Sequence, residues 1–191
     1  MSDNKQTPAA RWRARTKPRD RIFVIGNGGG GKTTLAHAIA DATALPIHEI
    51  DQIQFLPGWE VAPSESVAAQ VRSIIAEPRW LIDGFGPWET IEERSHAADT
   101  VIFVDFPVWI HFWWAAERQI AAVRGEARLG GPEDCPLTEK TREVFEAIGR
   151  VHEQIRPRLV DLFEALPERV ELLRITSPEE LQELHEALRT P

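Results

Sequence analysis

Cysteine is nearly absent from this chain of 191 residues, in which Cys135 is the only one. A lone thiol forms no disulfide within the chain and no zinc site built from several thiolates. The six histidines contain no close pair at the spacing of metal ligands, so we assign no zinc site to them. Such low cysteine usage suits a reducing compartment, and we expect a cytoplasmic protein in which Cys135 is a structural or incidental thiol.

Long hydrophobic runs are also missing. The longest apolar stretch, residues 101–116, is interrupted by Asp105, Pro107 and His111 and is too short to span a bilayer. The first residues lack the apolar core of a secretory signal. We therefore expect no membrane partner.

Acidic residues outnumber basic ones, and the formal net charge is -8. This balance argues against a protein that coats nucleic acid. The basic residues gather at the start, where residues 1–21 carry seven Lys or Arg against two acids and almost no apolar side chains. We expect residues 1–20 to form a basic disordered tail. A contact between this tail and an anionic partner stays open as the alternative.

The chain does contain a regular alternation of two kinds of segment. Short apolar, partly β-branched runs typical of buried strands occupy residues 21–25, 46–50, 80–82, 100–104 and 170–175. Stretches with helical composition lie between them at residues 32–44, 64–77, 87–97, 108–123 and 138–166. The alternation predicts an α/β fold with a five-stranded parallel sheet and helices on both faces, in one domain spanning residues 21–191. A segment rich in glycine and proline near residues 124–137 predicts a lid-like loop.

The motif Gly26-Asn27-Gly28-Gly29-Gly30-Gly31-Lys32-Thr33 fits the phosphate-binding pattern G-x-x-x-x-G-K-[ST]. It follows a predicted strand and opens a predicted helix, which is the context in which backbone N–H groups converge on an anion. Lys32 is expected to reach the β- and γ-phosphates of ATP, and the Thr33 hydroxyl is expected to hold Mg²⁺. No N-K-x-D segment follows, so guanine selectivity lacks its usual support. The predicted nucleotide-binding residues are Gly26, Asn27, Gly28, Gly29, Gly30, Gly31, Lys32, Thr33 and Thr34.

Three aspartates each end a predicted strand. They are Asp51, Asp83 and Asp105. Ligands gather at the carboxyl ends of strands in a parallel sheet, so these side chains are expected to face the phosphate site. Asp83 is predicted to hold Mg²⁺ together with Thr33, and Asp105 is its rival for that role. Asp51 is predicted to bind or deprotonate the hydroxyl of a phosphate acceptor.

Arginines are the candidates for a charge clamp over the triphosphate. Arg118 lies toward the end of a predicted helix, and Arg124 and Arg128 lie in the segment that follows it. They are predicted to close over the transferred group. Arg94 and Arg142 are further candidates, with a solvated surface arginine as the alternative for each of them.

The tryptophans admit more than one interpretation. Trp109 and Trp113 are four residues apart and would share a helix face, which favours packing over a base-stacking platform. Trp59 lies in the loop after Asp51, where it could line an acceptor pocket or pack against its neighbours.

Four stretches together resemble the topology-modulation-type proteins, which are adenylate-kinase-like P-loop proteins. The stretches are residues 26–34, Asp51 with the run at 55–59, residues 80–84 and residues 98–105. The similarity extends over about residues 21–188. Asp83-Gly84-Phe85 also resembles the D-G-F-P-R segment of adenylate kinases, although Gly86-Pro87-Trp88 replaces its proline and arginine. The resemblance implies a P-loop fold of the nucleoside and nucleotide kinase type.

The combined prediction is an ATP- and Mg²⁺-dependent kinase that transfers the γ-phosphate to a small acceptor, which could be a nucleoside, a nucleotide or a hydroxylated metabolite. The alternative is a nucleotide-binding regulatory protein that contacts nucleic acid through its basic tail. Both a monomer and a homodimer remain open. The candidate catalytic residues are Lys32, Asp51, Asp83, Arg118, Arg124 and Arg128.

Overall fold

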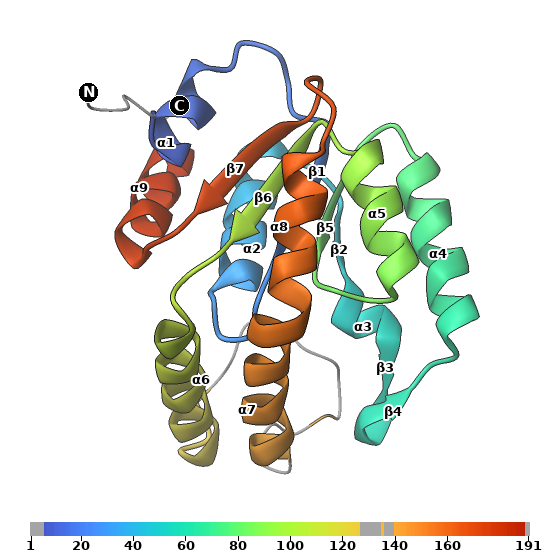
Figure 1. Cartoon of the computed structure of the whole chain (residues 1–191), viewed down its shortest axis with the longest axis vertical. Helices are drawn as coiled ribbons and strands as arrows, with labels where there is room; N and C mark the ends of the chain where they lie inside the picture. The colour runs from blue at the N-terminus through green and yellow to red at the C-terminus, as the bar shows by residue number, and fades with distance from the viewer. Residues whose placement is uncertain (1–5, 127–134, 136–139, 190–191) are drawn as a thin grey trace.

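A five-stranded parallel sheet forms the centre of the computed structural model, which describes residues 6–126, 135 and 140–189 (Figure 1). The strand order across the sheet is β2-β5-β1-β6-β7. The strands are β1 (Arg21–Gly26), β2 (Ile47–Glu49), β5 (Trp80–Asp83), β6 (Thr100–Val104) and β7 (Glu171–Ile175). A separate antiparallel hairpin consists of β3 (Phe55–Leu56) and β4 (Glu60–Val61).

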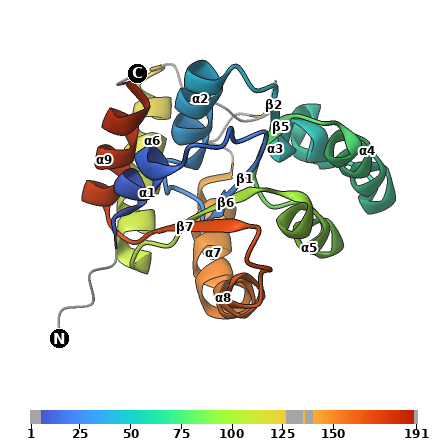
Figure 2. The same cartoon turned by 90° about the horizontal axis from the view of Figure 1, so that it is seen from above.

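Helices cover both faces of the sheet, as seen from above in Figure 2. One face packs on α2 and α9, and the other packs on α4, α5 and α8. The described helices are α1 (Pro8–Ala14), α2 (Lys32–Thr43), α3 (Ile50–Gln54), α4 (Ser64–Ala76), α5 (Trp88–Ala97), α6 (Val108–Val123), α7 (Thr141–Arg150), α8 (Arg156–Glu164) and α9 (Pro178–Arg189). The expected three-layer arrangement is therefore present.

The central strand β1 pairs with β5 along one edge and with β6 along the other. Helices cover both of its faces. Ile22 and Val24 point into the core shared with α2 and α9, whereas Phe23 and Ile25 point into the core shared with α4, α5 and α8. All four side chains are fully buried, which explains why this strand reads as a continuous apolar run. Its carboxyl end carries the chain directly into the glycine loop.

The second strand is shorter than the sequence predicts. It ends at Glu49, and Asp51 lies in the first turn of α3 rather than at a strand end. The hairpin β3–β4 follows, with a turn of 3-10 helix at Pro57–Trp59 between its strands. These short elements contain too few residues for a periodic signal, so the sequence did not reveal them.

The long helix predicted over residues 138–166 is interrupted. Within the described residues a π-helical stretch, Val151–Ile155, joins α7 to α8. The N–H of Arg156 bonds to the carbonyl of Val151, five residues earlier. Pro157 explains the change, because its ring has no N–H and displaces the carbonyl four residues before it.

The N-terminal segment differs from the disordered tail that we expected. Thr7 caps α1 through a 3.3 Å hydrogen bond from the N–H of Ala10, and Pro8 occupies the first turn. Trp12 packs against the core beside α2 and α9. The segment is polar and basic, which predicted disorder. In the structure, however, its arginines form ion pairs with acidic side chains at the edge of the sheet.

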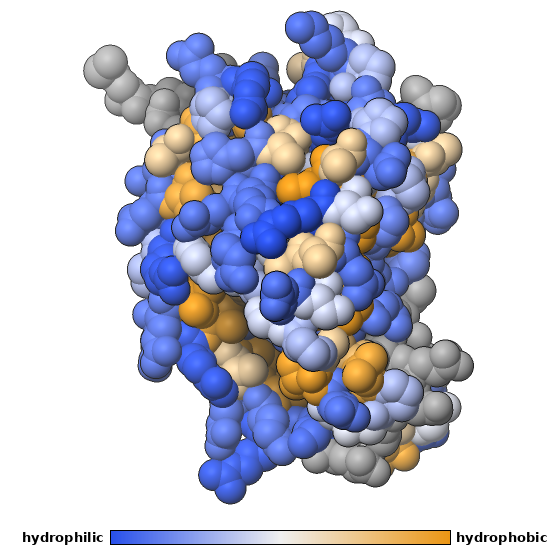
Figure 3. Space-filling view, turned by 90° about the vertical axis from the view of Figure 1, so that its right-hand side faces the viewer, coloured by the Kyte–Doolittle hydropathy of each residue, from blue (hydrophilic) through white to orange (hydrophobic). Residues whose placement is uncertain are grey.

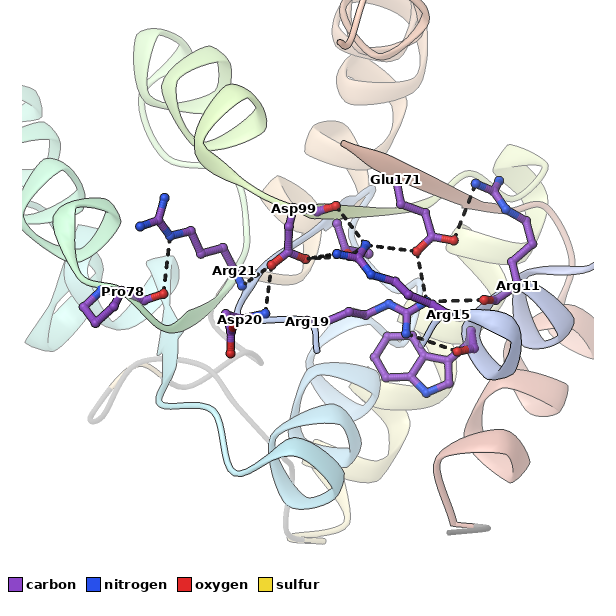
Figure 4. A network of polar contacts seen from close by, with 10 residues as sticks. Arg11, Arg15, Arg19, Asp20, Arg21, Pro78, Asp99 and Glu171 are labelled. Atoms are coloured by element: carbon purple, nitrogen blue, oxygen red, sulfur yellow. Dashed lines mark hydrogen bonds and ion pairs between the residues drawn. The ribbon is translucent and has the colours of Figure 1, made fainter. Parts of the chain in front are cut away.

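Those partners are Asp99 and Glu171, at the start of β6 and of β7 (Figure 4). Glu171 accepts a hydrogen bond from Arg15 at 3.2 Å and one from Arg19 at 2.9 Å. Asp99 accepts from the backbone N–H groups of Asp20 and Arg21, both at 2.8 Å. The basic segment is thus fastened to the amino-terminal edge of the sheet, away from the glycine loop.

The surface over α4 and α5 is mostly hydrophilic, with hydrophobic side chains visible in a hollow in its lower half (Figure 3).

No helix in the described part of the chain combines the length and the apolar character needed to cross a membrane.

Deleting residues 1–19 should lower the free energy of unfolding by about 2–4 kcal/mol, because Glu171 loses its arginine partners and the core loses Trp12. Deleting residues 1–5 is the matched control, since it leaves Thr7 and α1 in place. Urea denaturation followed by circular dichroism measures the difference. Equal stability of the two truncated proteins would show that α1 contributes nothing to the fold.

Candidate nucleotide-binding site

The glycine loop runs from the end of β1 to the start of α2, and at two positions its backbone adopts a conformation that favours glycine. Gly29 and Gly31 have φ values of 70° and 74°, in the left-handed region. A Cβ on Gly29 would lie 2.4 Å from the carbonyl oxygen of His111 in α6. The loop is therefore pressed against α6, and the backbone N–H groups at the start of α2 form a concave cradle for an anion.

His111 forms part of the wall behind this cradle. Its Nδ1 lies 3.0 Å from the carbonyl oxygen of Gly28, so Nδ1 carries the hydrogen and donates it. Burial, and secondarily the charge of Lys32, lower the pKa of His111 to about 4. The ring is consequently neutral near pH 7, and it supports the loop without adding charge.

Asn27 fastens the other side of the loop. Its side-chain amide donates to the carbonyl of Ile148 in α7 at 2.8 Å, and its Oδ1 accepts from the N–H of Gly28 at 2.7 Å. The Lys32 ammonium donates to the carbonyl of Asn27 at 2.7 Å. Burial lowers the pKa of Lys32, while the negative charges of Asp83 and Asp51 oppose that shift.

Asp83 lies at the end of β5, and only one of its two carboxylate oxygens accepts a hydrogen bond from a described residue. Its Oδ2 accepts a 2.7 Å hydrogen bond from the Thr33 hydroxyl. Its Oδ1 is buried and has no hydrogen-bond partner among the described residues. Burial raises the pKa of Asp83, and Lys32 and Thr33 counteract this. A partnerless carboxylate oxygen beside a hydroxyl fits a Mg²⁺ ion, which takes few protein ligands and completes its shell with phosphate and water.

Clusters of three or more His, Cys, Asp or Glu side chains that could hold a metal by themselves do not occur in the described residues. Thr33 and Asp83, which share a hydrogen bond beside the loop, could hold Mg²⁺ together with the phosphates of a nucleotide. Both were predicted for this role from the sequence.

The other two aspartates have different surroundings. Asp51 is exposed in α3, and its charge acts on both Lys32 and Asp83. Asp105 follows β6 but is buried in ion pairs, with Arg156 at 3.0 Å and Arg174 at 2.9 Å from its Oδ2. Its oxygens are saturated by guanidinium groups, so the geometry favours Asp83 over Asp105 for the metal.

Of the two candidate arginines within the described residues, Arg118 and Arg124, only Arg118 reaches the cavity beside the loop. Arg118 lines the cavity next to the glycine loop. Arg124 follows the last turn of α6, is exposed and does not line that cavity. Arg128 lies outside the described residues, as does most of the predicted lid-like segment near 124–137. The roles predicted for Arg124 and Arg128 stay predictions.

Arg94 and Arg142 belong to other parts of the structure. Arg94 is fully buried and donates to the carbonyls of Gly84, Phe85 and Thr90. Burial lowers its pKa to about 9. It therefore shapes the turn that follows Asp83 rather than reaching a phosphate. Arg142 is exposed and pairs with Glu146 at 2.8 Å.

A cavity of about 330 Å³ opens beside the loop, between the start of α2 and α6. It is lined by Gly29, Gly30, Gly31, Lys32, Thr33, Thr34, Trp114, Arg118, Ala121, Ala122 and Glu126. A second cavity of about 500 Å³ shares Gly31, Thr34 and Trp114 with it and continues toward Pro178 and Leu181 of α9.

One face of α6 holds the glycine loop, and Arg118 was the only residue of that face predicted from the sequence. His111 and Ala115 touch Gly29 or Gly30, and Arg118 and Ala122 continue the same face into the cavity. These four residues are spaced by four, three and four positions, which is the helical period. That spacing was the signal that could have identified them.

Trp59 and Cys135 meet at the hairpin. The N–H of Trp59 donates to the Cys135 sulfur at 3.3 Å, and the thiol lies at the same distance from the carbonyl oxygen of Leu56. The Trp59 ring packs edge-on against Phe55, with 5.4 Å between their centroids. Cys135 is buried, which agrees with a structural thiol.

Neither a search of protein-family models nor a search of curated proteins gives a match to this chain. Solved structures do match it. A shikimate kinase from Acinetobacter baumannii, in complex with shikimate, is 14% identical with a TM-score of 0.55, over 88% of this chain and 89% of that one. A sugar kinase from a Janibacter species is 18% identical with a TM-score of 0.48, over 90% and 93% of the two chains. A shikimate kinase from Bacteroides thetaiotaomicron is 15% identical with a TM-score of 0.48, over 89% and 96%.

The match to the first of these structures confirms the fold class predicted from the sequence, a three-layer P-loop fold of the kinase type. The narrower resemblance to topology-modulation-type proteins stays a prediction.

The buried neutral state of His111 predicts a pH-dependent loss of stability. Its folded pKa lies below its unfolded pKa, so the unfolded chain binds a proton first and stability falls between about pH 6.5 and pH 4. His111→Asn retains an amide donor near the position of Nδ1 and should reduce this loss by about 2–3 kcal/mol at the acidic end.

Urea denaturation of the wild type and of the variant between pH 7 and pH 4 measures the two slopes. Other acidic groups titrate in both proteins, so the difference between the slopes isolates His111. Parallel slopes would contradict the assignment of a buried neutral imidazole.

Proposed function

We propose that this protein is an ATP- and Mg²⁺-dependent kinase that transfers the γ-phosphoryl group to a small hydroxylated acceptor. One observation carries the proposal. The Thr33–Asp83 hydrogen bond places a buried carboxylate oxygen, which has no hydrogen-bond partner among the described residues, beside the hydroxyl and the ammonium that end a glycine loop. A purely structural Asp83 would need a partner for its Oδ1, because burial of an unsatisfied carboxylate oxygen is costly.

Different groups of the site bind the phosphate oxygens and the metal ion. The backbone N–H groups of the loop and the Lys32 ammonium bind the phosphate oxygens, and Arg118 adds positive charge from α6. Thr33 and Asp83 would hold Mg²⁺, which would offset the negative charge of the phosphates. His111 and Asn27 keep the loop in shape from either side.

The adenosine part of ATP has space in the second cavity. That cavity joins the phosphate cavity at Gly31, Thr34 and Trp114, and its far wall is formed by Pro178 and Leu181. An indole, a proline ring and a leucine side chain suit the faces of an aromatic base.

Asp51 is the proposed contact for the acceptor. It is exposed near Lys32 and Asp83, so it can accept the hydrogen of a hydroxyl group placed opposite the γ-phosphate. The hydroxyl oxygen forms a bond to the γ-phosphorus, the bond from this phosphorus to the β,γ-bridging oxygen breaks, and the proton passes to Asp51 or to solvent as ADP leaves. The likeness in fold to a shikimate kinase, which acts on a small hydroxylated molecule, supports an acceptor of this class.

The alternative, a regulator that contacts nucleic acid through its basic tail, is not favoured. Arg11, Arg15 and Arg19 all pair with Glu171, at 3.6, 3.2 and 2.9 Å. Arginines committed to a carboxylate are less available to neutralise phosphates.

Lys32→Ala should reduce turnover by roughly a hundredfold or more, because a positioned cation at the developing charge is lost. Lys140→Ala is the matched control, since Lys140 is a partly exposed lysine paired with Glu143. ADP release is measured across nucleosides, nucleoside monophosphates and hydroxylated metabolites, first with the wild type to find the acceptor. Unchanged ADP release by Lys32→Ala would exclude the proposed site.

The wild-type protein should show no salt-sensitive affinity for nucleic acid, as measured by fluorescence anisotropy with labelled DNA and RNA at increasing ionic strength. Binding that weakens steeply with salt, and that disappears when residues 1–19 are removed, would support the regulator instead.

A further inference from the structure

Arg94 of α5 places a guanidinium group inside the protein, where its partners are not carboxylates. The side chain is fully buried. Its hydrogen bonds within the described residues go to three main-chain carbonyls and one hydroxyl. Burying a charge without a counter-ion costs stability, and a neutral donor could bind the same oxygens at a lower cost. The charged fork is therefore a feature of the fold whose use the nucleotide cradle does not account for.

The hydrogen bonds of Arg94 join the end of β5 to α5 and hold the guanidinium from several directions. Its Nε donates to the carbonyl of Thr90 at 2.9 Å, and its Nη1 donates to the carbonyl of Gly84 at 2.9 Å. Its Nη2 donates to the carbonyl of Phe85 and, at 3.3 Å, to the Thr90 hydroxyl. The guanidinium carbon also lies 4.4 Å from the centroid of the Phe23 ring in β1. A planar fork spans these partners, which a single ammonium group could not do.

The turn that Arg94 binds, residues 84–86, follows Asp83 directly. Gly86 has a φ of 73°, in the left-handed region. A Cβ at this position would lie 2.9 Å from the Cγ2 of Ile50 and 3.6 Å from the Nη2 of Arg94. The turn is therefore enclosed between Arg94 on one side and Ile50 on the other, with no room for a side chain on Gly86.

Ile50 connects this turn to the acceptor side of the site. It is fully buried and is the first residue of α3, and Asp51 follows it in the same helical turn. The charge of Asp51 acts on Asp83, so the two carboxylates face the same space. Asp83 precedes the turn that Arg94 binds, and Asp51 follows the residue on which that turn packs. The stack of Arg94, turn and Ile50 thus sets the separation of the two aspartates.

We propose that Arg94 is a positioning residue for phosphoryl transfer, which fixes Asp83 on the metal side relative to Asp51 on the acceptor side. This inference rests on the proposed function and adds a residue that touches neither nucleotide nor acceptor. A reacting group that is misplaced by about 1 Å can lose roughly a hundredfold in rate, so a rigid fork beneath the two aspartates has a direct effect on transfer.

Arg94→Lys keeps the positive charge but replaces the fork by one ammonium group. Its kcat should fall roughly tenfold or more, because Asp83 and Asp51 are no longer held at the right separation. Its KM for ATP should change little, because the glycine loop and Lys32 bind the phosphates. Both constants are measured by ADP release with the acceptor found for the wild type.

Isothermal titration calorimetry with ADP gives a readout that does not depend on turnover. Mg²⁺ should raise the affinity of the wild type for ADP. In Arg94→Lys this gain should shrink roughly tenfold, because Asp83 is displaced, whereas the affinity for ADP in EDTA should stay the same.

Arg19→Lys is the matched control, because Arg19 is a similar arginine at the opposite edge of the sheet (Figure 4). Its side chain is also nearly buried, donates to the carbonyl of Trp12 at 3.1 Å and lies 4.1 Å from the centroid of the Trp12 ring. This variant should lose stability in urea as Arg94→Lys does, yet keep the wild-type kcat and the wild-type gain from Mg²⁺.

Gly86→Ala displaces the same turn from the side of Ile50 and leaves Arg94 unchanged, so it should also lower kcat with little change in the KM for ATP. It provides the test if Arg94→Lys does not fold. Wild-type kcat in either folded variant would overturn the proposal. Equal losses in Arg19→Lys would do so too, as would an equal loss of ADP affinity with and without Mg²⁺. A wild type that releases ADP with no acceptor would contradict the kinase activity instead, and the calorimetry would still decide the role of Arg94.

Discussion

The close contact between the glycine loop and α6 is the constraint on which the rest of the site depends. The space for a side chain on Gly29 is filled by the carbonyl oxygen of His111, so the loop must pass with bare backbone. That approach directs the loop N–H groups toward the cavity and sets where Lys32 and Thr33 begin α2. A phosphate cradle therefore arises from packing between a loop and a helix that are about eighty residues apart in sequence.

The aspartates at the carboxyl ends of β5 and β6, the two strands that flank β1, have different chemistry because their surroundings differ. Asp83 ends β5 beside Thr33 and Lys32 and keeps one oxygen without a partner among the described residues. Asp105 follows β6 but faces Arg156 and Arg174, which neutralise it. Burial raises the pKa of Asp83, and the charge of Lys32 and the hydrogen bond from Thr33 only partly oppose this shift. The uncompensated carboxylate is the one suited to a metal.

Two peripheral helices, α1 and α6, differ in how far their apolar side chains are buried. Helix α1 buries Trp12 and pairs its arginines with Glu171 and Asp99, so a segment with the composition of a tail becomes part of the fold. Helix α6 buries the faces that touch the loop and α7 but leaves Trp109, Trp113, Ile120 and Val123 exposed, so the expected packing of the two tryptophans is not found. Contacts within the chain therefore make α1 part of the fold, whereas they leave this face of α6 in solvent.

The sequence by itself determined the parallel sheet and the glycine loop, because strand periodicity and the phosphate-binding motif are local patterns. It also named Asp83 as a candidate for the metal, with Asp105 as its rival, and that role stays a prediction. Only the tertiary structure decided that Asp105 and Arg94 bind other groups of the protein, that His111 supports the loop, and that α1 is ordered. Each of these depends on groups distant in sequence, whose burial and charge act only once the sheet and helices have assembled around them.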